Sequence, residues 1–304
     1  MLNWTTIRES LVPVRDKSTL PSSVKLPILP LAVTKFAERA EDPNSDPREL
    51  GKIIESDSGL TAELLRYVNS SAMGARAKLS TAQQAITRLG IRDSKLFILT
   101  TAVKRSMKSA ESRLINIQNF WMNNLERALV AREVAKLLKT DGELAFAAGL
   151  LQDFLLPLLS NELYPVYLRF TQEQLTNPVE LTQFERQAFK WDHADAAAQI
   201  MLQWKFPDDL ICCVYAHHRG LNLLKDPQLG RSAAAAVAVS ALVPDQLHQI
   251  PDGLEQLVKL DSVWPQFKLT ELAERVDAQY REMSPGPVNQ FSLLRHVKRM
   301  TAAC

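Results

Sequence analysis

Helix-forming signals recur along this chain from residue 30 onward, and no strand-type alternation competes with them over any length. In SDPRELGKIIESD, Asp46 is suited to cap a helix and Pro47 to occupy its first position. In SGLTAELLRYVNSS, the apolar residues Leu60, Leu64 and Val68 recur at helical spacing. Because such signals repeat through most of the sequence, we expect an all-α fold, a helical bundle without a sheet.

The caps also suggest where the chain divides. In STAQQAITRLG, Ser80 and Gln83 have the spacing of a capping box, and Gly90 is a natural helix stop. Helices in the first part are short and frequently capped, whereas those in the second part are longer and more apolar. We therefore expect two helical subdomains sharing one core. The expected boundaries are a segment at 1–20, a domain at 21–219 with halves at 26–115 and 116–219, and a helical extension at 220–304 packed on that domain.

Composition excludes several classes of protein. With 36 basic and 34 acidic residues the net charge is only +2, so no nucleic-acid partner is indicated. The adjacent Cys212 and Cys213, two of three cysteines, make no disulfide framework and are best explained as small core residues. The N-terminus has no signal-type apolar region, and no window reaches the roughly 18 apolar residues of a membrane span. We expect a cytoplasmic protein that makes no membrane contact.

The stretch AGLLQDFLLPLL places Gln152 and Asp153 inside an apolar run that predicts a buried helix, with Asp153 near its middle. An ionised carboxylate is costly to bury without a partner, and the local sequence supplies no cation. The partner of Asp153 must therefore come from elsewhere in the fold. A serine, a backbone amide, an arginine of another helix or an imidazolium would each serve.

Three of the five histidines are candidates for the neighbourhood of Asp153. His193 follows a candidate cap at Asp192, and His217 and His218 close the helix that follows Pro207. Packed as antiparallel neighbours, these helices would bring one oxygen and several imidazoles together, a ligand mixture that divalent transition metals accept. Two simpler interpretations remain open: His193 is partly exposed beside its cap, and the histidine pair marks a helix end where imidazolium suits the dipole.

An ordered set of motifs gives the chain a family resemblance. LPILPL opens it, AGLLQD, HADAAAQIMLQWKFPDDL and AHH continue it, and the pattern as a whole resembles the HDOD domain, the HD-related output domain of bacterial signalling proteins. The residues that carry its first half are Pro27, Pro30, Asp57, Leu60, Asn69, Ser70, Gly74 and Gly90.

The resemblance also implies a lost active site. HD-superfamily enzymes are metal-dependent phosphohydrolases with a His-Asp dyad, an earlier His and a later Asp. Here the dyad position holds Gln152 and Asp153, the earlier position falls at or near Asn123, and Ser240 or an apolar neighbour stands at the later one. Neutral amides are weak donors, so we expect tight metal binding and hydrolysis to be lost, with no metal or other cofactor. The vestigial cluster, expected to survive as a buried polar network, comprises Asn123, Gln152, Asp153, His193, His217 and His218.

Three functional hypotheses follow. The resemblance implies a non-catalytic regulatory module that acts through protein contacts, and because the flanks at 1–25 and 220–304 are short, we expect its signalling partner in trans. A second hypothesis is a metal-dependent phosphohydrolase or phosphodiesterase with a reduced ligand set. The third is a sensor of a small ligand such as a nucleotide, whose anion would meet Lys104, Arg105 and Lys108, although these more simply form a solvated helix face.

Overall fold

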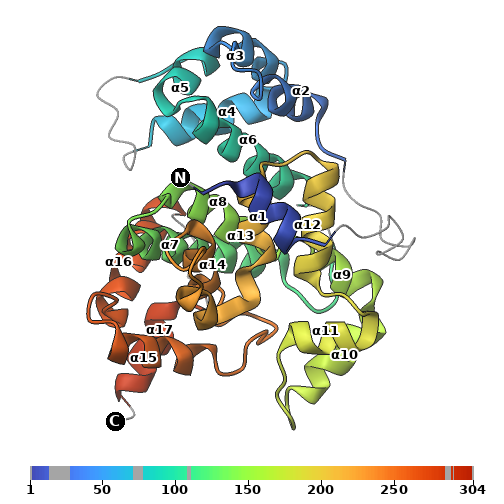
Figure 1. The fold of residues 1–304 in the computed structure, drawn as a ribbon, viewed down its shortest axis with the longest axis vertical. Helices are drawn as coiled ribbons and strands as arrows, with labels where there is room; N and C mark the ends of the chain where they lie inside the picture. The colour runs from blue at the N-terminus through green and yellow to red at the C-terminus, as the bar shows by residue number, and fades with distance from the viewer. Residues whose placement is uncertain are drawn as a thin grey trace. The chain divides into compact units, whose positions relative to one another are not determined.

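The fold is helical throughout the part that the computed structural model describes, namely residues 2–13, 28–70, 78–107, 111–284, 289 and 291–302 (Figure 1). These residues form seventeen α-helices and a 3₁₀ helix, and no strand occurs among them. The all-α prediction is confirmed. The contacts between residues divide the chain into two units, which are described separately: unit 1 comprises residues 1–25, 110–202 and 207–304, and unit 2 comprises residues 26–109 and 203–206.

Unit 2 is built from five helices, of which four have 8–11 residues, as the frequent caps predict, and the last has 16. They are α2 (Leu31–Arg39), α3 (Pro47–Glu55), α4 (Ser58–Val68), α5 (Ala82–Leu89) and α6 (Ile91–Ser106). The Asp46 side chain accepts a hydrogen bond from the Arg48 amide, and Pro47 opens α3, as expected. Leu60, Leu64 and Val68 are all buried on one face of α4.

The cap of α5 lies one residue later than predicted. The hydroxyl of Thr81, not that of Ser80, accepts a hydrogen bond from the Gln84 amide, and the Gln84 side chain accepts one from the Thr81 amide. The sequence STAQQ offers two overlapping capping boxes, so local pattern alone does not choose between them. A distant residue helps to fix the register, because the Glu55 carboxylate accepts a hydrogen bond from the amide of Ala82, the first residue of α5.

The motif residues of unit 2 act mainly on the backbone. Asp57 caps α4 by accepting from the Leu60 amide at 2.9 Å, and it also pairs with Arg105 at 3.0 Å. The Asn69 side chain accepts from the Leu79 amide and donates to the Leu79 carbonyl oxygen, both at 2.8 Å. The side-chain amide of Asn69 therefore holds the backbone of Leu79, ten residues later, close to the end of α4.

The remaining motif residues have simpler roles. Gly90 ends α5 and precedes α6 at a positive φ of 83°, a conformation that glycine adopts without strain. Pro30 directly precedes α2, and the Ser70 hydroxyl donates to the Tyr67 carbonyl oxygen at 2.7 Å. Pro27 and Gly74 lie outside the described residues, as does Lys108.

Unit 1 includes the most apolar helices, but its helices are not generally longer, so the predicted difference in length is wrong: α7 has 22 residues, whereas α8 to α14 have 7–11. Helix α7 packs against α8, α14 and α16, while α14 also contacts α8, α13 and η2. The elements of this unit are α1 (Trp4–Leu11), α7 (Ile117–Leu138), α8 (Gly142–Leu151), α9 (Leu156–Glu162), α10 (Tyr164–Glu173), α11 (Leu181–Phe189), α12 (His193–Gln203, its last residue grouped with unit 2), α13 (Asp208–Tyr215), the 3₁₀ helix η2 (His217–Lys225), α14 (Ala233–Ser240), α15 (Gly253–Val263), α16 (Leu269–Met283) and α17 (Leu293–Ala302).

The backbones of helices α7 and α8 are in close contact at Gly149. A Cβ atom at this position would lie 2.9 Å from the Cα of Ala128 and 3.2 Å from the Cβ of Ala131. The absence of a side chain at Gly149 is therefore what allows the two helices to approach so closely.

The expectation that no window is apolar enough to span a membrane is wrong for one stretch, because Gly142–Glu162 is long and apolar enough, with a mean hydropathy of 1.4. However, 78% of its most apolar window is buried inside the protein. A buried core helix has the same composition, so this stretch is weak evidence for a membrane span.

A buried carboxylate ties the last helix to the rest of unit 1. Glu126 of α7 accepts a hydrogen bond from the Leu293 amide at 2.8 Å, at the start of α17, and another from the Asn289 side chain at 2.6 Å. Burial and the nearby charge of Asp277 raise the pKa of Glu126 to about 7, against the opposing effect of these hydrogen bonds.

Candidate functional site

Asp153 lies in a turn between α8 and α9, not in the middle of a helix as the sequence suggested. Residues 152–155 form this turn, and Pro157 stands in the first turn of α9. A proline removes a backbone donor, and its ring clashes with the carbonyl four residues earlier, which here belongs to Asp153. The apolar run is therefore broken at the carboxylate, and Asp153 itself is fully buried.

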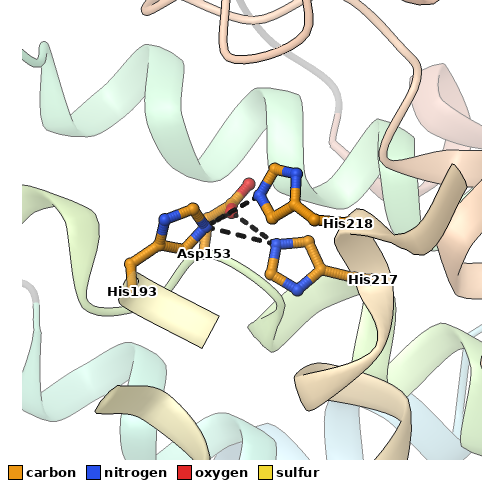
Figure 2. A group of neighbouring side chains, drawn as sticks. All are labelled: Asp153, His193, His217 and His218. Carbon is orange, nitrogen blue, oxygen red and sulfur yellow. Dashed lines mark hydrogen bonds and ion pairs between the residues drawn. The ribbon is translucent and has the colours of Figure 1, made fainter. Parts of the chain in front are cut away.

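Three imidazole rings converge on Asp153. His193 begins α12. His217 and His218 begin η2 and do not close the preceding helix as predicted, because α13 already ends at Tyr215. The Oδ1 atom of Asp153 lies 3.3 Å from Nε2 of His193 and 3.2 Å from Nε2 of His217. His193 Nε2 lies in turn 3.3 Å from His217 Nε2 and 2.9 Å from His218 Nε2. Figure 2 shows the four side chains pointing toward one another.

The hydrogen bonds at Nδ1 of His193 and His217 show which nitrogen of each ring carries a hydrogen. His217 Nδ1 is 2.6 Å from the Val214 carbonyl oxygen, which can only accept, so Nδ1 carries the hydrogen. His193 Nδ1 is 2.7 Å from Glu185 Oε2 and donates to this carboxylate. If both rings are neutral, His218 Nε2 can still donate to His193 Nε2, but the contact between His217 Nε2 and Asp153 Oδ1 then joins two acceptors. A proton on a ring or a metal ion would satisfy this contact.

The donor set fits a divalent metal ion. The oxygen and the three nitrogens all lie within 4.8 Å of one another. Imidazole and carboxylate ligands bind zinc at about 2.0–2.2 Å, which sets neighbouring ligand atoms roughly 3–3.5 Å apart. Asp153, His193, His217 and His218 would hold such an ion, which would supply a Lewis acid able to polarise a bound oxygen.

The other oxygen of Asp153 is committed to a side-chain cation. Arg127 of α7 donates from Nη1 to Asp153 Oδ2 at 2.6 Å and from Nη2 to Asp245 Oδ2 at 2.8 Å. The same guanidinium donates to the carbonyl oxygens of Ala241 and Val243, and Gln249 Nε2 donates to Asp153 Oδ2 at 3.1 Å. The two carboxylate oxygens thus face different partners, with imidazoles on one side and a guanidinium on the other.

These contacts determine the charge states. Burial alone would raise the pKa of Asp153, but hydrogen bonds from His193 and His217 and the charge of Arg127 hold it well below its usual value. Burial would likewise lower the pKa of His193, but Glu185 and Asp153 hold it well above. Burial and the two neighbouring imidazoles lower the pKa of His218. Without a metal, His193 is therefore the charged ring and His218 a neutral one.

The structure brings together four of the six residues predicted for the vestigial cluster. Asn123 is buried but donates to the Pro244 carbonyl oxygen at 3.1 Å. Gln152 is also buried, and neither of its amide atoms has a hydrogen-bond partner among the described residues. The expected loss of metal binding rested on these two amides taking the place of imidazole ligands. Neither amide belongs to the group of four donors, so that loss stays a prediction.

The structure decides one of the two simpler interpretations of the histidines. His193 is only 1% exposed, so the alternative of a partly exposed ring beside its cap is wrong. Its neighbour Asp192 does cap α12, accepting from the Asp195 amide at 2.8 Å. Of the partners considered for Asp153, the structure shows two kinds, the imidazoles and an arginine of another helix.

Several residues of the site were not identified from the sequence. Arg127 follows Asn123 by four positions, so the helical repeat of α7 was a usable signal that both side chains share a face. Glu185 precedes His193 by eight residues in another helix, and Asp245 and Gln249 lie in a turn-rich segment. No local pattern links these three residues to Asp153.

A pocket opens on the Arg127 side of Asp153. Its volume is about 250 Å³, including open space at its mouth. Only about 10 Å³ of it is enclosed space, roughly enough for a single water molecule, so the pocket is small. Its lining residues are Ile115, Phe120, Asn123, Asn124, Arg127, Asp153, Leu156, Asp245, Gln246, Leu247 and Gln249.

Solved structures share this fold at low sequence identity. A candidate phosphohydrolase from Shewanella amazonensis SB2B superposes with a TM-score of 0.61 at 20% identity, covering 94% of this chain and 95% of its own. An HDOD domain protein of unknown function from Geobacter sulfurreducens gives 0.58 at 18% identity, covering 92% and 90%. A candidate signal transduction protein from Marinobacter aquaeolei VT8 gives 0.59 at 18% identity, covering 92% and 64%.

Sequence comparison supports the same assignment. An uncharacterised protein of Treponema pallidum (strain Nichols) is 21% identical over 246 residues, or 78% of this chain. The chain spans about half, 47%, of the length of that relative. The family model of the HDOD domain matches residues 26–220, which is more than half of the chain. The resemblance seen in the motifs is thereby confirmed, and the chain belongs to the HDOD domain family.

Proposed function

We propose that this HDOD protein is a non-catalytic regulatory module that acts through contacts with a signalling partner in trans. The observation that carries the proposal is the buried ion pair between Arg127 and Asp153 Oδ2. It commits one oxygen of the central carboxylate to a side chain that cannot leave without exposing an unpaired buried charge.

The ion pair bears directly on phosphoryl chemistry. Many metal-dependent phosphohydrolases use two ions about 3.5–4 Å apart, which clamp the attacking and the leaving oxygen. A carboxylate that gives one oxygen to each of two such ions needs both of its oxygens. In this chain Arg127 and Gln249 already hold Oδ2, so Asp153 has only Oδ1 to offer. The small pocket on the Arg127 side likewise does not support a nucleotide-sized substrate or ligand.

The alternative is a metal-dependent phosphohydrolase that works with a single ion. One specific observation favours it, namely the convergence of Asp153, His193, His217 and His218. Two of the solved structures with this fold are described as candidate phosphohydrolases, one of them as metal-dependent. The two proposals differ in whether the cluster turns over a substrate or only stabilises the fold.

An activity assay separates them. Purified protein with added Mn²⁺ would be tested on phosphodiester, nucleotide and cyclic-dinucleotide substrates, beside Asp153→Ala and His193→Ala variants. We expect no turnover above that of the variants. Mn²⁺-dependent turnover that both substitutions abolish would replace the regulatory proposal with the enzymatic one.

A binding experiment tests the regulatory role directly. The full chain, carrying a photo-crosslinker at exposed positions, would be used to capture partners in the source cell. We expect a protein of a signalling pathway that binds the purified chain with a measurable Kd. If no captured protein binds the purified chain, the proposal fails.

A further inference from the structure

A second layer of buried groups lies behind the His193 ring. Glu185 of α11 accepts two hydrogen bonds at Oε2, from His193 Nδ1 at 2.7 Å and from the His193 backbone amide at 3.0 Å. Tyr167 of α10 donates its hydroxyl hydrogen to Glu185 Oε1 at 2.6 Å. Both side chains are almost completely excluded from solvent. Helices α10 and α11 therefore hold one imidazole in place although neither provides a donor to the cluster.

Burying a carboxylate here is costly unless it does something that a neutral residue cannot. Tyr167 and the His193 ring and amide satisfy the hydrogen-bonding needs of Glu185, but none of them is a permanent cation. Within the buried centre Asp153, Asp245 and Glu185 carry three negative charges, and Arg127 carries one positive charge. With neutral histidines the centre has two negative charges in excess, which is the charge that one divalent ion balances.

We propose that Glu185, supported by Tyr167, is a positioning residue that prepares the cluster for a divalent transition-metal ion. It does so in two ways. Its hydrogen bond holds one proton of His193 on Nδ1, so that an ion entering the cluster displaces only the proton on Nε2, the atom that faces Asp153 and the other imidazoles. Its charge supplies half of the excess that attracts the ion. The inference concerns metal affinity and does not depend on whether the protein hydrolyses a substrate.

The substitution Glu185→Gln tests the effect of the negative charge while nearly preserving the shape of the side chain. Gln keeps an acceptor oxygen at nearly the same place and removes one negative charge. Loss of such an outer partner typically lowers metal affinity by about 10- to 100-fold. Tyr167→Phe removes only the hydrogen bond to Glu185 Oε1 and should lower the affinity in the same direction by a smaller factor.

The experiment is a Co²⁺ titration of the metal-free full chain, followed in the visible spectrum and by calorimetry, with Zn²⁺ competition to rank the variants. We expect one Co²⁺ per wild-type chain with a spectrum of nitrogen ligation, and about 10- to 100-fold weaker binding by Glu185→Gln. The matched control is Glu133→Gln, which removes a buried carboxylate that α7 directs toward Arg275 and Gln279 of α16. This control should bind Co²⁺ like the wild type.

Every outcome decides the proposal. Absence of Co²⁺ binding by the wild type overturns it, and so does equal affinity of wild type and Glu185→Gln. If Glu185→Gln does not fold, as judged by circular dichroism, ¹⁵N NMR of the histidine rings in the Zn²⁺-loaded wild type decides instead. A His193 ring protonated at Nδ1 and ligated through Nε2 supports the proposal, and a proton on Nε2 overturns it.

Discussion

The backbone contacts of two motif residues in unit 2 and the side-chain contacts of Asp153 in unit 1 span very different distances along the chain. In unit 2, Asp57 accepts from an amide three residues away, and Asn69 pairs with a backbone ten residues away. In unit 1, Asp153 is contacted by Arg127, His217 and Gln249, which are 26, 64 and 96 residues away. The first kind of partner lies within ten residues, whereas the second kind exists only once unit 1 has packed.

The two regions also differ in solvent access, and this difference should govern their energetics. The Asp57–Arg105 pair is partly exposed, with side-chain exposures of 19% and 31%. The Asp153–Arg127 pair has exposures of 1% and 2%. Water can replace a lost partner in the first pair but not in the second, so the same type of substitution should have unequal effects.

The largest expected effect is that of Arg127→Met. It leaves Asp153 and Asp245 buried without their guanidinium, and breaking a buried pair in this way costs about 3–5 kcal/mol. Arg105→Met, the matched change in unit 2, should cost at most about 1 kcal/mol. Urea denaturation of both variants measures the losses, and equal losses would break the comparison.

Glu126 should give a pH dependence of similar size. Its pKa is raised to about 7 in the folded protein, so folding takes up a proton between the unfolded pKa and this value. The contribution is present below the unfolded pKa, near 4.5, and is lost as the pH rises through about 7. The shift corresponds to about 3 kcal/mol.

The corresponding measurement compares the wild type with Glu126→Gln by denaturation across this pH range. The difference in free energy of unfolding, wild type minus variant, should fall as the pH rises. Hydrogen exchange of α17, whose first amide Glu126 accepts, would localise the effect. A difference that is flat with pH would show that Glu126 does not carry the effect.

Asn69→Ala should have an intermediate effect in unit 2. It removes two hydrogen bonds to Leu79, each worth about 0.5–1.5 kcal/mol, so the free energy of unfolding should fall by about 1–3 kcal/mol. Asn69→Asp keeps the acceptor for the Leu79 amide and loses the donor, and should lie between alanine and the wild type. Thermal denaturation at neutral pH would rank the three proteins, and an order other than this one contradicts the paired geometry.

The smallest expected effect tests the register of α5. Thr81→Ala removes the cap and should cost about 1 kcal/mol, whereas Ser80→Ala should cost much less. Urea titrations of the two single variants would suffice. If Ser80→Ala lowers the free energy of unfolding more than Thr81→Ala does, Ser80 is the cap, as the sequence first suggested.

The same comparison explains how much of the fold the sequence could predict. The caps at Asp46 and Asp192 and the stop at Gly90 were predictable because residue and partner lie within one helical turn. The α5 cap was misplaced by one residue because two equivalent boxes overlap and the distant Glu55 helps to choose between them.

The candidate site was predictable only in part. That Asp153 needs a partner followed from the cost of burial, and the three histidines were the chemically suitable candidates. The break at Asp153 also had a local cause in Pro157, four residues later, which the apolar pattern concealed. Arg127, Glu185 and Asp245 were missed because tertiary packing, not local spacing, brings them to the site.

The close contact at Gly149 has a consequence for the whole polar centre. Gly149 precedes Asp153 by one helical turn, and its neighbour Ala128 follows Arg127 directly in the chain. Because Gly149 has no side chain, α7 and α8 can come close together, and this distance sets how near the Arg127 guanidinium comes to the Asp153 carboxylate. An alanine there would force the helices apart by a few tenths of an ångström or more, and would stretch an ion pair that it never touches.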